Sequence, residues 1–229
     1  GQLRFSPRTK TSRLVRKHSF EAEFDHITDN GGSLETRELK GTYRLELHNN
    51  DQWTIDASRN FERLRESFTI VRGLVIPQGD YRFGDFRTTY QLGPQRRLSG
   101  TVTLGTGSFY NGRNTQIGYG GLIEVSPRFS VEPGISLNRL DLTTGTATTT
   151  LVTSRLNLML SPLMAVSGLA QYNSTASTLS ASLRYRWEYR PGSNLFVVYS
   201  DGRDTLNRVG FPDLVNRTFV VKATRLWRF

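Results

Sequence analysis

The sequence predicts an all-β protein, a transmembrane antiparallel up-and-down β-barrel of about twelve strands with both termini in the periplasm. Three features of the 229-residue chain predict it. Apolar and polar side chains alternate with a period of two along many segments. The connections between these segments alternate between short turns and longer loops. The chain ends in the alternating, aromatic segment 219–229.

The alternation is clearest in residues 179–190. Its odd positions are apolar: Leu179, Ala181, Leu183, Tyr185, Trp187 and Tyr189. Its even positions are polar: Ser180, Ser182, Arg184, Arg186, Glu188 and Arg190. Successive side chains of a strand point to opposite faces, whereas a helix has a period near 3.6 residues. The segment is also longer than the usual strand of about five or six residues. It therefore predicts a long strand with one apolar face and one polar face.

The same pattern predicts about twelve strands, and single-chain bacterial barrels require an even number. These strands lie near residues 12–27, 35–48, 52–63, 80–92, 98–110, 114–126, 129–139, 149–160, 163–173, 179–190, 194–201 and 216–229. The sequence thus predicts a periplasmic N-terminal segment, residues 1–11, followed by one outer-membrane β-barrel domain, residues 12–229.

The connections are of two kinds. One kind is short and rich in turn-forming residues: 49–51, 93–95, 126–127, 161–162 and 191–193. The other kind is mostly longer: 28–34, 64–79, 140–148 and 202–215. Outer-membrane barrels have short periplasmic turns and long extracellular loops, whereas a soluble sandwich has no reason to sort its loops in this way. The apolar loop 64–79 is expected either to enter the mouth of the barrel or to cap its rim.

Aromatic side chains fall into two belts on the projected apolar face. The periplasmic belt contains Trp53, Tyr90, Phe129, Trp187, Tyr189, Trp227 and Phe229. The belt near the long loops contains Phe24, Phe61, Tyr81, Tyr110 and Tyr172. Aromatic girdles at both membrane interfaces are typical of such barrels. Between Phe83 and Phe86 the alternation changes phase, which predicts a β-bulge.

The composition limits the function classes. The chain has no cysteine, which excludes disulfides and thiol catalysis. Thirty Lys and Arg against twenty Asp and Glu give a formal charge of +10. These charges recur singly through the strands instead of clustering, so we expect no nucleic-acid partner. The residues from Gly1 onward show no basic segment followed by an apolar one, so any signal peptide is expected to have been removed, and the chain is expected to be a mature protein or an excised domain.

Several stretches also carry a family resemblance. They are residues 64–70, 75–83, 107–112, 130–133, 171–174, 186–199 and 216–219. Together they resemble the C-terminal barrel region of a bacterial family of unknown function. Members of that family carry an N-terminal carbohydrate-binding module similar to family 9. The resemblance implies a location in the bacterial outer membrane and implies no catalytic residues. It also implies that the N-terminal module is missing from this chain.

The polar positions define a charged interior. The basic residues expected to line the lumen are Lys40, Arg44, Arg155, Arg184, Arg186, Arg190 and Lys222. The first strand contributes an acidic ladder, Glu21, Glu23 and Asp25. We expect Lys40 and Arg44 from the second strand to pair with this ladder, and Lys222 to reach it from the last strand after barrel closure. The excess of arginine on the later strands would favour anions in a pore.

These features predict a narrow, weakly anion-preferring pore that passes small anions or acidic saccharides. Its other partners would be outer-membrane lipid and the barrel-assembly machinery, the latter through the C-terminal strand. One alternative is a closed barrel that anchors or exports the missing module without conducting ions. A second is a soluble basic β-sandwich that binds polyanions. His18, His26 and His48 form neither a catalytic pairing nor a metal signature, so we expect no enzyme activity, cofactor or metal.

Overall fold

The structure is a computed structural model that describes the chain except residues 72, 207–210 and 228–229. The described residues form fifteen β-strands and no helix. Accordingly, no helix among them is long and apolar enough to cross a membrane. The strand pairings of the described residues are antiparallel, for example that of β13 with β14. The prediction of an all-β antiparallel fold is therefore confirmed.

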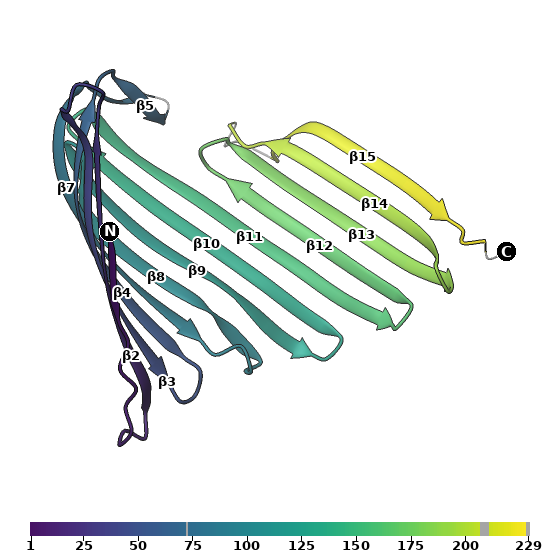
Figure 1. Cartoon of the computed structure of the whole chain (residues 1–229). Helices are drawn as coiled ribbons and strands as arrows, with labels where there is room; N and C mark the ends of the chain where they lie inside the picture. Colours follow the sequence, from purple (N-terminus) through teal and green to yellow (C-terminus); the bar gives the residue numbers. More distant parts are fainter. Residues whose placement is uncertain (72, 207–210, 228–229) are drawn as a thin grey trace. The chain divides into compact units, whose positions relative to one another are not determined.

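Thirteen strands of the described chain form one sheet, in the order β1-β2-β3-β4-β7-β8-β9-β10-β11-β12-β13-β14-β15, and β5 and β6 form a separate hairpin (Figure 1). The strands are β1 (Gln2–Phe5), β2 (Val15–Thr28), β3 (Leu34–Leu47), β4 (Gln52–Leu64), β5 (Phe68–Val71), β6 (Leu74–Ile76), β7 (Gly79–Leu92), β8 (Leu98–Phe109), β9 (Gly112–Ser126), β10 (Phe129–Leu142), β11 (Gly145–Ser161), β12 (Met164–Asn173), β13 (Thr178–Arg190), β14 (Ser193–Asp204) and β15 (Asp213–Thr224). Each of the twelve segments predicted from the alternation overlaps one of the long strands.

The chain divides into two compact units, which are described separately. Unit 1 comprises residues 1–119 and 137–148, and unit 2 comprises residues 120–136 and those from Thr149 onward. Unit 2 contains the strands with the clearest alternation. In Figure 1 its strands β12, β13, β14 and β15 run side by side, joined on one side by short turns.

Both ends of the sheet differ from the prediction. Residues 1–11 were expected to contain no strand, but β1 pairs with β2 from Gln2↔Glu23 to Phe5↔Phe20. Four residues are too few for a period of two to be detected. The last strand was expected to continue to residue 229, but β15 ends at Thr224. Its partner β14 begins at Ser193, so the ladder stops at the pair Asn194↔Thr224.

The predicted loop 64–79 contains the hairpin β5–β6, which builds the apolar core of unit 1. Leu74, Ile76 and Leu142 are buried together, and Ile76 has no exposed surface. Tyr81, Phe109 and Tyr110 pack against them. The hairpin is tied to the β10–β11 turn, because the Thr144 hydroxyl donates a 3.1 Å hydrogen bond to the carbonyl of Val75. The loop therefore folds back onto unit 1.

This hairpin explains the change of phase in β7. The register between β4 and β7 is continuous from Leu64↔Gly79 to Gln52↔Gln91, so β7 has no bulge against β4 between Phe83 and Phe86, where one was predicted. Tyr81 lies opposite Glu62, and Phe83 lies opposite Asn60. Both rings are therefore on the polar face, and the assignment of Tyr81 to an apolar belt is also wrong. Apolar residues are stable there because the hairpin supplies an apolar partner.

Ile76→Ala is expected to loosen the hairpin by about 2–5 kcal/mol, the usual loss when a buried isoleucine is truncated. Hydrogen–deuterium exchange of the peptide covering residues 68–76 should become faster. Val75→Ala is a matched control, since Val75 on the same strand is 39% exposed. Equal exchange in the two variants would contradict the assignment of Ile76 as the centre of this core.

Candidate functional site on the polar face of the sheet

The register places the charged side chains of neighbouring strands on one face of the sheet. Glu23 on β2 lies opposite Lys40 on β3, which lies opposite Ser58 on β4. Ser58 in turn lies opposite Asp85 on β7. Alternate residues of each strand point to the same side, so this row defines a polar face. The intervening residues form an apolar face.

In unit 1 the acidic ladder is only partly neutralised by its neighbours. Lys40 Nζ lies 3.9 Å from Glu23 Oε2, as the predicted pairing requires. Arg44 lies opposite Ser19 rather than an acid, and its buried Nε has no hydrogen-bond partner among the described residues. Asp25 lies opposite Glu38, so two carboxylates face each other at that position. Unit 1 therefore has an acid-rich polar face.

The neighbour of the ladder on the other side is β1, not the last strand. Arg4 lies opposite Glu21, and the side-chain amide of Gln2 donates a hydrogen bond to the Glu21 carboxylate. Lys222, which was expected there, lies opposite Phe196 on β14. The expected contact of Lys222 with the ladder required closure between the first and last long strands, and β1 occupies that edge of β2 instead.

In unit 2 the predicted basic residues gather on the polar face. Arg155 and Arg184 line one depression of about 460 Å³, together with the small polar residues Ser167, Ser182 and Ser200. Arg186 is two residues from Arg184 and lies opposite Phe196, which in turn lies opposite Lys222. The small side chains between the arginines leave room for an anion beside the guanidinium groups.

Few carboxylates are available to these cations. Arg155 lies 3.7 Å from Glu132, which also accepts a 3.1 Å hydrogen bond from Asn157. Glu188 accepts a hydrogen bond from the backbone N–H of Gly192 in the neighbouring turn. Among the described residues, no carboxylate lies within ion-pair distance of Arg184 or Lys222. The same holds for Arg186. These three residues form the unpaired basic wall of unit 2.

Two predicted basic positions have local features of their own, Arg184 within this wall and Arg190 outside it. The guanidinium of Arg184 stacks over the Phe196 ring at 4.8 Å, which fixes its orientation while leaving its charge available. Arg190 lies at the turn end of β13 opposite Ser193, where the register shifts. Because a bulge breaks the alternation, parity does not assign Arg190 to either face.

The predicted aromatic residues lie mostly at the short-turn ends of the strands. Trp53 donates a 2.7 Å hydrogen bond from its indole N–H to Thr88 and lies opposite Tyr90. The rings of Trp187 and Tyr189 are 6.1 Å apart, and the Tyr189 hydroxyl donates to the carbonyl of Thr224. Trp227 follows the end of β15, and the guanidinium carbon of Arg225 lies 4.0 Å from the centroid of its ring. Phe229 lies outside the described residues.

Sequence reasoning missed a buried carboxylate, Asp51, in the turn between β3 and β4. It is 3% exposed. It accepts hydrogen bonds from the Gly93 N–H at 2.7 Å and the Tyr90 hydroxyl at 2.9 Å, and it pairs with Arg96 at 3.0 Å. Burial alone would raise the pKa of Asp51, but these donors together lower it below its ordinary value. The Asp51 network thus joins the β3–β4 turn to the β7–β8 turn.

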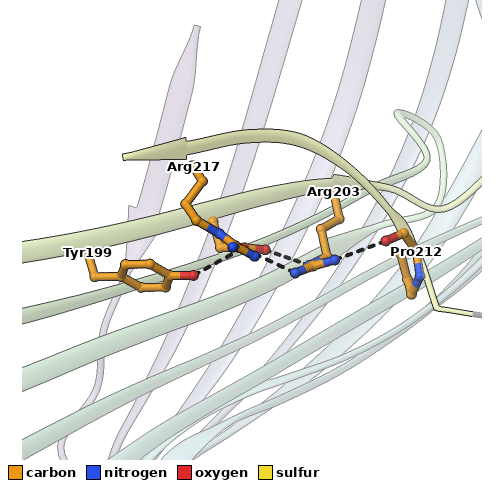
Figure 2. Close-up of polar contacts among 5 residues, drawn as sticks. Tyr199, Arg203, Pro212 and Arg217 are labelled. Atoms are coloured by element: carbon orange, nitrogen blue, oxygen red, sulfur yellow. Dashed lines mark hydrogen bonds and ion pairs between the residues drawn. The ribbon is translucent and has the colours of Figure 1, made fainter. Parts of the chain in front are cut away.

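Sequence reasoning also missed a second cluster, which lies on the apolar face of unit 2 towards the C-terminal end of β14 (Figure 2). Asp201 pairs with Arg203 at 2.6 Å and with Arg217 on β15 at 3.0 Å. The Tyr199 hydroxyl donates to Asp201, and Arg203 donates to the carbonyl of Pro212. Asp201 and Arg203 are odd-numbered positions of β14, like Tyr199, and therefore lie on its apolar face. A carboxylate at an apolar-face position is the sequence feature that could have revealed this cluster.

The described residues contain no group of three or more His, Asp or Glu side chains arranged to hold a metal ion. No protein-family model matches the chain, and no curated protein matches it with significance.

Proposed function

We propose that this chain is a bacterial outer-membrane β-barrel that forms a narrow, weakly anion-preferring, water-filled pore. The twelve long strands, β2–β4 and β7–β15, would close with the polar face inside and both termini in the periplasm. Small anions or acidic saccharides would pass along the lumen. The observation that carries this function is the unpaired basic wall, Arg184, Arg186 and Lys222.

The apolar face supports the membrane location. Large apolar side chains are exposed along it in both units, among them Leu39 at 53%, Leu104 at 47%, Leu183 at 51% and Val221 at 55%. Soluble monomers rarely expose apolar surface this continuously, whereas a lipid-facing wall requires it. The soluble sandwich alternative would need a second layer to cover these residues.

The position of β1 sets a condition on closure. It occupies the edge of β2 along Phe20–Glu23, where the last strand would otherwise pair. In a twelve-stranded barrel β1 must leave this edge. If β1 stays, it becomes the strand that meets β15. The resemblance to the C-terminal barrel region of the carbohydrate-module family agrees with either arrangement.

A closed barrel that anchors or exports an N-terminal carbohydrate-binding-like module is the second candidate. The hairpin β5–β6 favours it, because this hairpin packs on the polar-face ring of Tyr81 at the long-loop end of unit 1. Apolar cover at that position would narrow an entrance. In such a barrel the interior charges would serve stability and the bilayer would not conduct.

Planar-bilayer recording of the purified whole chain separates the two candidates. The pore predicts steady single-channel currents, with a reversal potential in a salt gradient that shows preference for anions. Insertion without current would reject the pore and favour the anchor. Insertion is measured independently by flotation of the protein with phosphatidylcholine liposomes, and protein that stays out of the liposomes would reject both candidates.

A further inference from the structure

A basic patch interrupts the apolar face of unit 1 close to its long loops. One row of the register runs from His26 on β2 through Arg37 on β3 and Phe61 on β4 to Arg82 on β7. Arg59 lies two residues from Phe61 on the same side of β4. These side chains line one depression of about 600 Å³, with Phe24 and Leu39 beside them. We call this set of residues the basic patch.

The arginines of the basic patch form no ion pair among the described residues, although Arg82 interacts electrostatically with nearby Asp80. No described carboxylate lies within ion-pair distance of Arg37, Arg59 or Arg82. Two carboxylates share this face nearer the loops, and both are engaged by other arginines. Asp80 lies 2.8 Å from Arg63, and Glu35 lies 3.4 Å from Arg65. The three arginines of the basic patch are therefore available to bind an anion from outside the chain.

The position of the patch indicates the kind of anion. Arg37 and Arg82 each lie three residues from the loop end of their strands, which begin at Leu34 and Gly79. On a lipid-facing wall, arginine is costly at mid-membrane and tolerated near the headgroups. In the proposed topology this end faces the outer leaflet. The anion would then be a lipid headgroup.

The chemistry of the patch matches a phosphorylated amphiphile. Guanidinium groups bind phosphate through two parallel hydrogen bonds. Arg37 and Arg82 are separated by the intervening strand β4, so their backbones are about 10 Å apart. This spacing suits a headgroup with two phosphates. Phe24 is 45% exposed and Leu39 is 53% exposed, and both offer apolar surface to acyl chains beside the phosphates.

We infer that the basic patch binds a bisphosphorylated glycolipid of the outer leaflet, with Arg37, Arg59 and Arg82 as the phosphate ligands. This inference rests on the proposed membrane location but not on conductance. Phe61, which is 7% exposed beneath Arg82, supports the guanidinium by cation–π contact at 6.0 Å to the ring centroid. The Asp201 cluster of unit 2 also presents two arginines on the apolar face, but its carboxylate already binds both.

Glycolipid retention by the detergent-solubilised whole chain, measured by native mass spectrometry, tests the inference. The probe is a bisphosphorylated disaccharide lipid, compared with its dephosphorylated form and with phosphatidylglycerol. Wild-type protein should retain the bisphosphorylated form at least about tenfold more strongly than either other lipid, since charge-assisted bonds dominate the recognition. Equal retention of the phosphorylated and dephosphorylated forms, or of phosphatidylglycerol, would overturn the inference without any variant.

Variants then assign the site. Arg59→Gln should weaken retention by about tenfold, and Arg37→Gln/Arg59→Gln/Arg82→Gln should abolish the preference for the phosphorylated form. Arg217→Gln, which removes the same charge from the Asp201 cluster, is the matched control and should retain the lipid normally. Retention by the triple variant equal to wild type would reject this site. Flotation with phosphatidylcholine liposomes reports the membrane location separately, so wild-type protein that floats normally but shows no preference for the phosphorylated glycolipid rejects the inference alone.

Discussion

Replacing Asp51 with alanine is expected to lower the free energy of unfolding by about 2–4 kcal/mol, because a buried charged acceptor with several donors is lost. The Gly93 N–H and the Arg96 guanidinium both bind this carboxylate, and no other carboxylate pairs with Arg96 among the described residues. The substitution would leave the Gly93 donor buried without its acceptor. Guanidinium-induced unfolding in detergent, followed by tryptophan fluorescence, measures the loss.

Asp80→Ala is the matched control for this prediction. Asp80 also pairs with an arginine, Arg63 at 2.8 Å, but its side chain is 50% exposed. Exposed ion pairs contribute about 0–1 kcal/mol, so this variant should unfold close to the wild type. If both variants lose the same stability, burial does not distinguish the Asp51 network from a surface pair.

The difference in free energy of unfolding between wild type and Asp51→Ala should also depend on pH, which gives an independent check of the role of Asp51. The pKa of Asp51 is lowered in the folded chain from an ordinary value of 3.8. The folded state therefore binds the proton less tightly than the unfolded state does, and the carboxylate stabilises the fold at any pH well above 3.8. As the pH falls below that value and through the lower folded pKa, the contribution disappears. The gap in stability between wild type and Asp51→Ala should narrow over that acidic window.

The strands were predictable because their signal is local and repeated. A two-residue period over a long segment, as in 179–190 against the observed Thr178–Arg190, specifies both the strand and its two faces. Strand ends depend instead on the partner strand. Thr224 is the last residue of β15 because its partner β14 begins at Ser193. The sequence of residues 216–229 alone does not indicate where the β13–β14 turn lies.

The polar-face positions of Arg155, Arg184, Arg186 and Lys222 followed from parity alone. The Asp51 network did not, because its donors Tyr90, Gly93 and Arg96 come from the end of β7 and the turn after it, far away in the sequence. Tyr81 was misplaced for a similar reason. Its apolar partner is the β5–β6 hairpin, and the sequence showed that segment as an apolar loop without showing which face it covers.

Replacing both Arg184 and Arg186 with glutamate is expected to reverse the ion preference of the proposed pore from anions to cations. The double change shifts the charge of the polar face by −4, since two positive side chains become negative. A single charge contact is worth about 1 kcal/mol in water, so the anion-to-cation permeability ratio should fall by at least about tenfold. Reversal potentials in a salt gradient across a planar bilayer measure this ratio directly.

The structure makes these two positions the decisive ones. Arg155 already shares Glu132, whereas Arg184 and Arg186 have no carboxylate to bind among the described side chains, so their whole charge acts on a passing ion. Arg184→Lys with Arg186→Lys keeps the charge and should keep the anion preference, even though lysine loses the planar stacking of Arg184 on Phe196. An unchanged reversal potential in the glutamate variant, with conductance intact, would remove both residues from the selective wall. A shift of the same size in the lysine variant would show that shape, not charge, sets the selectivity.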